Sequence, residues 1–166
     1  RRSSDLGTGL IGRNIIKSLD SNNHEITVFT RSPEKAKSVV PNCKNYITWN
    51  YVSKNGEWTE YVKQADAVIY LAGESVVSKR WTKEQKYIIR NSRIEGTKNI
   101  VNVINKSDTN VKTFITGSAI GYYGYQSASK VTENSEAGND FLARITDELE
   151  SVSKSLKEKN IRRVLV

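Results

Sequence analysis

Gly7-Thr8-Gly9-Leu10-Ile11-Gly12 is the stretch that decides the fold, because it reads G-x-G-x-x-G and runs directly into a helical pattern. The apolar residues on one face of that helix are Leu10, Ile11, Ile15, Ile16 and Leu19. Glycines let a backbone approach a pyrophosphate closely, and a helix N-terminus adds N–H donors and a positive dipole. The motif predicts a phosphate-binding loop, and the alternative is a flexible loop before an ordinary helix.

The rest of the chain alternates strand and helix patterns. Helices are predicted from Ser32-Pro33 onward and over residues 83–104 and 141–157, and strands over residues 25–30, 46–49, 67–71, 111–116 and 161–166. This alternation predicts βαβ units and a Rossmann-type, doubly wound parallel sheet of the α/β class, in one domain over residues 1–166. We expect the strands at 67–71 and 111–116 to be central, because of their apolar character.

Composition narrows the classes of function. Charged residues make up 27% of the 166 residues, and no apolar run approaches the ~20 residues that a membrane span needs. One cysteine, Cys43, suits a reducing cytoplasm, and with His24 as the one histidine no metal site is expected. The net charge of +8 is spread along the chain without a basic block, so we expect no nucleic-acid partner.

The segment Thr30-Arg31-Ser32 stands where this fold selects its dinucleotide. An acidic residue after the second strand binds the ribose hydroxyls of NAD, whereas an arginine can meet the 2′-phosphate of NADP. The chain has Arg31 and no acid there, which predicts NADP as the cofactor. The alternative is an ordinary surface arginine.

Several segments together resemble one family, the NAD-dependent epimerase/dehydratase branch of the extended short-chain dehydrogenases. The likeness is narrower to the atypical group called "epimerase family protein" or SulA-like nucleoside-diphosphate sugar epimerase. It covers residues 7–166 and rests on GTGLIGR (7–13), HEITVFTRSPEKAK (24–37), DAVIYLAGE (66–74), KRWTKEQK (79–86), NSRIEGTKNI (91–100), GSAIGYYG (117–124) and GNDFLARI (138–145).

The resemblance implies NADP(H) in the glycine loop and a smaller C-terminal substrate lobe, most of which this chain lacks. It also implies that Leu71-Ala72-Gly73 runs beside the adenine and ribose and that Arg93 faces the cofactor. Core packing is the alternative for Leu71 and Ala72, and a solvated helix face for Arg93. The family has an apolar strand and another glycine where residues 1–6 stand, so we expect a fragment of a longer protein or self-association.

The catalytic centre departs from the standard one. Short-chain dehydrogenases use a Tyr-x-x-x-Lys pair, and none of the eight tyrosines has a lysine four residues later. Ser118 is near the usual place of the catalytic serine, and Tyr122 or Tyr123 could reach a substrate or serve packing. Asp140 and Glu150 are weaker acid/base candidates. The sequence leaves two hypotheses: an NADP-dependent oxidoreductase or epimerase acting on a small, nucleotide-linked substrate, or a non-catalytic dinucleotide-binding sensor or interaction module.

Overall fold

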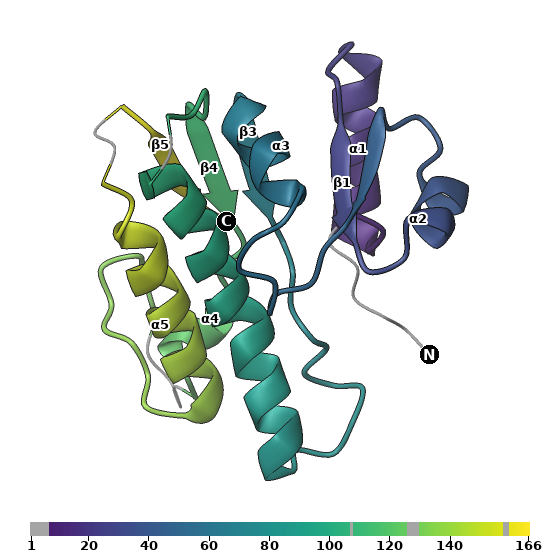
Figure 1. Ribbon diagram of the computed structural model, residues 1–166. Coiled ribbons are helices and arrows are strands. Elements are labelled where there is room, and N and C mark those ends of the chain that lie inside the picture. The colour runs from purple at the N-terminus through teal and green to yellow at the C-terminus, as the bar shows by residue number, and fades with distance from the viewer. Residues whose placement is uncertain (1–6, 107, 126–129, 158–159) are drawn as a thin grey trace.

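The computed structural model describes residues 7–106, 108–125, 130–157 and 160–166 (Figure 1). The questions raised by residues 1–6, including whether they form a first strand, lie outside these residues. Strands and helices alternate along the described chain, as the sequence predicts. Its strands are β1 (Thr27–Thr30), β2 (Asn45–Thr48), β3 (Ala67–Tyr70), β4 (Thr113–Thr116) and β5 (Arg162–Leu165).

All strand pairings among the described residues are parallel, which confirms the α/β, Rossmann-like prediction. β1 pairs with β2, and a second sheet has the order β3-β4-β5. β4 lies between two partners, as expected for a central strand. β3 has one partner strand within the described residues, although its alternate residues Val68 and Tyr70 are buried. Parallel pairing brings the carboxyl ends of neighbouring strands to one edge, where this fold binds its ligands.

The predicted helices are present, and the main difference from the prediction is two additional short helices. Ser32 stands at the N-cap of α2 (Pro33–Val39) and Pro33 in its first turn, but the Ser32 side chain makes no capping bond. Two short elements, α3 (Trp58–Gln64) and η1 (Ile120–Tyr123), are not predicted from the sequence. No helix within the described residues is long and apolar enough to cross a membrane. The helices are α1 (Leu10–Ser21), α2 (Pro33–Val39), α3 (Trp58–Gln64), α4 (Lys83–Lys106) and α5 (Phe141–Lys154), with the 3-10 helix η1 at Ile120–Tyr123.

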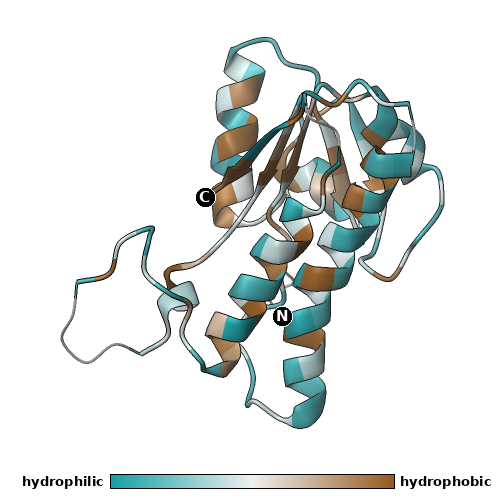
Figure 2. Cartoon of the chain, turned by 90° about the vertical axis from the view of Figure 1, so that its left-hand side faces the viewer, coloured by the Kyte–Doolittle hydropathy of each residue, from teal (hydrophilic) through white to brown (hydrophobic). Residues whose placement is uncertain are grey.

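The larger core lies between the strands and the long helices, and Figure 2 shows hydrophobic strands against helices with hydrophilic outer faces. An aromatic cluster of Phe29, Trp49, Trp58 and Tyr70 joins the two sheets. The ring centroid of Trp49 lies 5.6 Å from that of Trp58 and 6.1 Å from that of Tyr70. Because Phe29 and Trp49 belong to the β1–β2 side and Tyr70 to β3, this cluster fixes the sheets relative to each other.

A smaller core lies under α1 and α2. Of the five apolar residues expected on one face of α1, Ile16 is buried in this core. Leu10 and Ile11, in the first helical turn next to the glycine loop, are instead 72% and 65% exposed. The apolar stripe of α1 therefore does not predict which residues are buried in its first turn.

Gly96, in the interior of α4, allows that helix to lie close to β3. A Cβ at residue 96 would lie 1.8 Å from Oη of Tyr70, which no packed structure tolerates. The Tyr70 hydroxyl donates a hydrogen bond of 2.6 Å to the backbone oxygen of Ser92, one turn earlier in α4. Tyr70 is 2% exposed, so its ring cannot move aside without opening the core.

We expect Gly96→Ala to lower the free energy of unfolding by about 1–3 kcal/mol, although alanine favours helices, because the methyl group overpacks the contact with Tyr70. Urea unfolding followed by circular dichroism measures the change. Gly121→Ala is the matched control, since its Cβ would meet Leu142 at an ordinary 3.7 Å. A Gly96→Ala protein as stable as the unmodified one would contradict the packing argument.

Candidate functional site

A pocket of about 210 Å³ opens at the carboxyl ends of β1, β2 and β3, beside α4. It brings together four of the predicted cofactor residues, namely Thr30 at the end of β1, Arg31 directly after it, and Ala72 and Gly73 after β3. These residues are far apart in the sequence, and parallel pairing places them at one edge. The full lining is Thr30, Arg31, Trp49, Asn50, Tyr51, Ala72, Gly73, Glu74, Ile88 and Ser92.

Hydrogen bonds from α4 hold the loop after β3. The backbone N–H of Glu74 donates to Oγ of Ser92 at 2.9 Å, and Nη1 of Arg93 donates to the backbone oxygen of Glu74 at 3.0 Å. A Cβ at Gly73 would lie 2.6 Å from the guanidinium carbon of Arg93, so glycine leaves room for that side chain. Burial lowers the pKa of the Arg93 guanidinium. The side chain packs against the loop after β3 and does not point to solvent. Its expected contact with the cofactor stays a prediction.

The end of β1 has a defined turn. The backbone N–H of Ser32 donates to Oγ1 of Thr30 at 3.1 Å, and the backbone N–H of Trp49 donates to the Thr30 oxygen at 2.8 Å. Arg31 is exposed at the rim of the pocket, and Ser32 lies just outside its lining. The turn therefore presents a guanidinium, and no carboxylate, between the two short side chains.

The glycine loop lies at the N-terminus of α1. Gly9 is the N-cap of that helix, and its oxygen accepts from the backbone N–H of Arg13 at 3.0 Å. Gly7 packs closely, because a Cβ there would lie 2.9 Å from Cγ1 of Val28. The first turn of α1 has no acidic residue, so its N–H groups and positive dipole are not neutralised locally. Thr8 and Gly12 belong to the same loop and first turn.

The second group of predicted residues follows β4. Oγ of Ser118 donates a hydrogen bond of 2.6 Å to Oε1 of Glu150, on α5. Asp140 instead caps α5, since its Oδ1 accepts from the backbone N–H groups of Leu142 and Ala143. Leu71, predicted to run beside the cofactor, is not part of the pocket lining, and its Cδ2 lies 3.6 Å from the position that a Cβ at Gly117 would take. Glu150, a weak candidate from the sequence, is the partner of the serine.

Tyr122 and Tyr123 lie on η1, which packs against α5. Their rings meet edge to face with centroids 5.2 Å apart. The pKa of Tyr122 is raised from its ordinary value of 10.0, first by burial and then by the negative charges of Asp147 and Glu150. Its surroundings therefore favour the neutral phenol of Tyr122 over the phenolate.

Sequence reasoning missed six residues of the pocket lining. Three of them, Trp49, Asn50 and Tyr51, follow β2. They could have been found, because ligands of this fold bind at the carboxyl ends of the strands, as was used for Arg31 after β1. The other three, Glu74, Ile88 and Ser92, depend on how α4 packs against the loop after β3, for which the sequence gives no local signal.

The chain has clear relatives. The NAD dependent epimerase/dehydratase family matches residues 7–144. The chloroplastic epimerase family protein SDR39U1 homolog of Arabidopsis thaliana is 35% identical over 161 residues, which cover 96% of this chain and 45% of that protein. An epimerase family protein of Staphylococcus haemolyticus is 31% identical over 160 residues, 96% of this chain and 51% of the relative.

Solved structures agree with this result. The structure of human epimerase family protein SDR39U1 (isoform2) with NADPH superposes with a TM-score of 0.75 and 25% identity, over 96% of this chain and 50% of that one. The structure of a nucleoside-diphosphate sugar epimerase from Corynebacterium glutamicum superposes with a TM-score of 0.73 and 28% identity. The match covers 95% of this chain and 31% of that one. The chain thus spans about half the length, or less, of these proteins. It belongs to the NAD dependent epimerase/dehydratase family.

Proposed function

We propose that this chain is the nucleotide-binding half of an NADP(H)-dependent oxidoreductase or epimerase that acts on a small, nucleotide-linked substrate. The observation that carries the proposal is the pocket, in which Thr30, Arg31, Ala72 and Gly73 meet at one sheet edge. The relative that was solved with NADPH and the relative named a nucleoside-diphosphate sugar epimerase support the same assignment.

The residues present fit a dinucleotide. Gly7 to Gly12 and the first turn of α1 offer backbone N–H donors to a pyrophosphate, and no acidic side chain of that turn opposes its charge. The 210 Å³ pocket has the aromatic walls Trp49 and Tyr51 and the small residues Ala72 and Gly73, which suit a flat base with its ribose. Bound there, NADP(H) would supply or accept the hydride of the reaction.

Arg31 is the residue proposed to select NADP(H) over NAD(H). It lies on the pocket rim, and its guanidinium can meet a 2′-phosphate with two parallel hydrogen bonds. Glu74 is the pocket's one carboxylate, and Nε2 of Gln85 and Nζ of Lys79 lie 3.5 and 3.7 Å from its Oε1. These contacts moderate the negative charge of Glu74 within the pocket.

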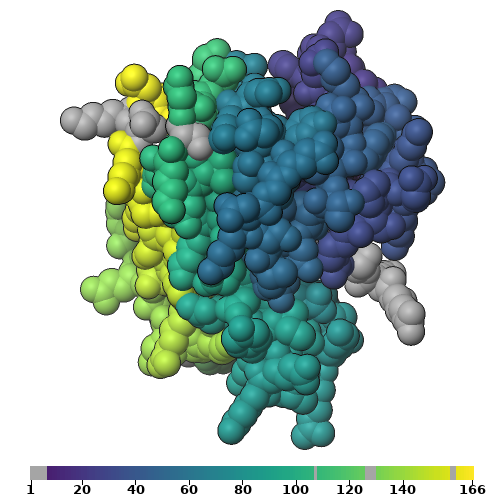
Figure 3. Space-filling view, in the orientation of Figure 1, coloured from purple at the N-terminus to yellow at the C-terminus, as the bar shows by residue number. Residues whose placement is uncertain are grey.

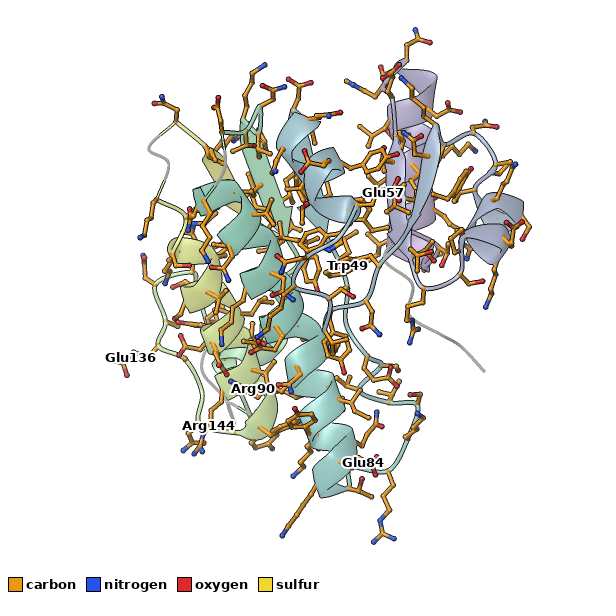
Figure 4. All side chains as sticks on the ribbon, viewed as in Figure 1. Trp49, Glu57, Glu84, Arg90, Glu136 and Arg144 are labelled. Atoms are coloured by element: carbon orange, nitrogen blue, oxygen red, sulfur yellow. The ribbon has the colours of Figure 1, made fainter. Side chains whose placement is uncertain are left out.

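We expect Arg31→Ala to weaken NADPH binding by about 1–3 kcal/mol, the scale of a charge-assisted hydrogen bond, and to leave NADH binding nearly unchanged. Titration with each reduced nucleotide, followed by nicotinamide fluorescence, gives both affinities. Arg144→Ala removes an equally exposed arginine from α5, away from the pocket (Figure 4), and should change neither affinity. Equal affinity of the unmodified protein for NADPH and NADH would refute the selection by Arg31.

The catalytic step is proposed to use Ser118, Glu150 and Tyr122. Ser118 would orient the substrate, Glu150 would accept a proton through the Ser118 hydroxyl, and Tyr122 would donate one. The Ser118–Glu150 hydrogen bond supports the first two roles, and the place of Tyr122 on η1, which packs against α5, supports the third. Tyr123 packs edge to face against Tyr122 and keeps its ring in place.

This assignment predicts the titration of Tyr122. We expect a pKa above 10.0 in the unmodified protein and a lower pKa after Asp147→Asn with Glu150→Gln, because two negative charges that disfavour the phenolate are gone. Carbon-13 NMR of labelled tyrosine measures it, with Tyr122→Phe to assign the signal. Glu57→Gln with Glu84→Gln removes two carboxylates elsewhere (Figure 4) and should leave this pKa unchanged. If the pKa of Tyr122 is the same in Asp147→Asn with Glu150→Gln as in the unmodified protein, the two carboxylates do not act on this tyrosine and the proposed site is wrong.

The absence of a Tyr-x-x-x-Lys pair favours a second function, a dinucleotide-binding sensor or interaction module without catalysis. Phe141 and Ile145 of α5 occupy that spacing, and neither can transfer a proton. Incubation with NADPH or NADP and UDP-glucose, followed by absorbance of the reduced nucleotide and by product analysis, separates the two functions. Tight NADPH binding without turnover across a panel of nucleoside-diphosphate sugars would favour the sensor.

A further inference from the structure

We propose that a second, basic pocket between α3 and α4 binds a small anion that carries at least two phosphate groups. This pocket has a volume of about 530 Å³, more than twice that of the nucleotide pocket. Figure 3 shows the face on which it lies, with α3 and the preceding loop in blue beside α4 in teal. Its lining is Lys54, Asn55, Thr59, Lys63, Glu95, Lys98, Asn99, Asn102, Val103 and Lys106.

The charge of the lining is strongly one-sided. Four lysines from three elements, the loop before α3, α3 itself and α4, converge on a pocket that has Glu95 as its one acidic residue. Lys63 pairs with Glu60 at 2.6 Å and Lys98 with Glu95 at 3.1 Å. Lys54 and Lys106 have no carboxylate within 4.0 Å among the described residues. The remaining lining is mostly amide and hydroxyl groups, which can donate hydrogen bonds to anionic oxygens.

These ion pairs indicate the class of ligand. An anion in this pocket must compete with Glu60 for Lys63 and with Glu95 for Lys98, and a single carboxylate offers no advantage over those already there. A phosphate group carries a charge between −1 and −2 at neutral pH and three strong acceptor oxygens, so a diphosphate has more charge and more acceptor oxygens than the carboxylates it must displace. Val103 is the one apolar residue in the lining, which disfavours a ligand recognised mainly by an apolar surface.

The pocket has one rigid wall. Asn99 is 6% exposed, and its Nδ2 donates to the backbone oxygen of Tyr51 at 2.7 Å. Tyr51 lines the nucleotide pocket, so one short loop forms a wall of both pockets, with Trp49 to Tyr51 on one side and Lys54 and Asn55 on the other. The basic pocket is nevertheless separate, because its lining shares no residue with the nucleotide pocket.

The test uses inorganic pyrophosphate as the probe, titrated by calorimetry and by proton–nitrogen NMR at constant ionic strength. We expect the side-chain amide signals of Asn99 and Asn102 to shift with saturation. The double variant Lys54→Ala with Lys106→Ala should weaken this binding by about tenfold, through the loss of two charge-assisted contacts. The same variant should keep the NADPH affinity of the unmodified protein, which separates this pocket from the proposed nucleotide site.

Lys154→Ala with Lys157→Ala is the matched control, because it removes the same charge from the end of α5 and the loop after it. Both lysines are exposed, and neither lines the pocket. An equal loss of affinity in the two double variants would show nonspecific attraction by net charge and would overturn the proposal. Shifts confined to Gly7–Gly12, or binding of polyglutamate in preference to pyrophosphate, would overturn it as well.

Discussion

The contact between Tyr70 and Gly96 is the constraint on which the rest of the site depends. Because residue 96 has no side chain, the Tyr70 ring can lie against α4 and donate to the Ser92 oxygen. Burial raises the pKa of Tyr70, so its hydroxyl remains a neutral donor. The same turn of α4 supplies Ser92 Oγ and Arg93 to the loop after β3. The spacing between a strand and a helix thus determines one wall of the nucleotide pocket.

The opposite wall depends on the aromatic cluster. Trp49 packs against Trp58 and Tyr70 in the core and also lines the pocket after β2. Its indole nitrogen is buried without a hydrogen-bond partner among the described residues, so packing must outweigh that cost. A change at Trp49 would therefore alter both the stability of the fold and the shape of this pocket, whereas Arg31 lies exposed at its rim.

Much of the fold and four of the ten residues of the pocket lining follow from the sequence, because parallel strands have local signals. The seven-residue helix α3 has too few turns to show a periodicity, and Trp58 and Val62 are its one buried pair. Glycine has a low helix propensity, so Gly96 in the middle of α4 is unexpected from the local sequence. A glycine is needed there because Tyr70, on β3, occupies the space of a side chain. Likewise, Glu150 becomes a partner of Ser118 only through the packing of α5 against η1, the segment that follows β4. The sequence does not predict which residues from distant segments come into contact in the folded protein.

The electrostatics after β4 are opposite in sign to those of the standard catalytic pair. In that pair a lysine lowers the pKa of the tyrosine, which favours the phenolate. Around Tyr122 burial and the carboxylates of Asp147 and Glu150 raise the pKa instead, and the serine hydroxyl points to a carboxylate. A proton transfer at this position would run with the carboxylate as acceptor and the phenol as donor. The charges around Tyr122 thus differ in sign from the lysine of the standard pair, and this tyrosine lies on η1, outside the α5 positions of that pair.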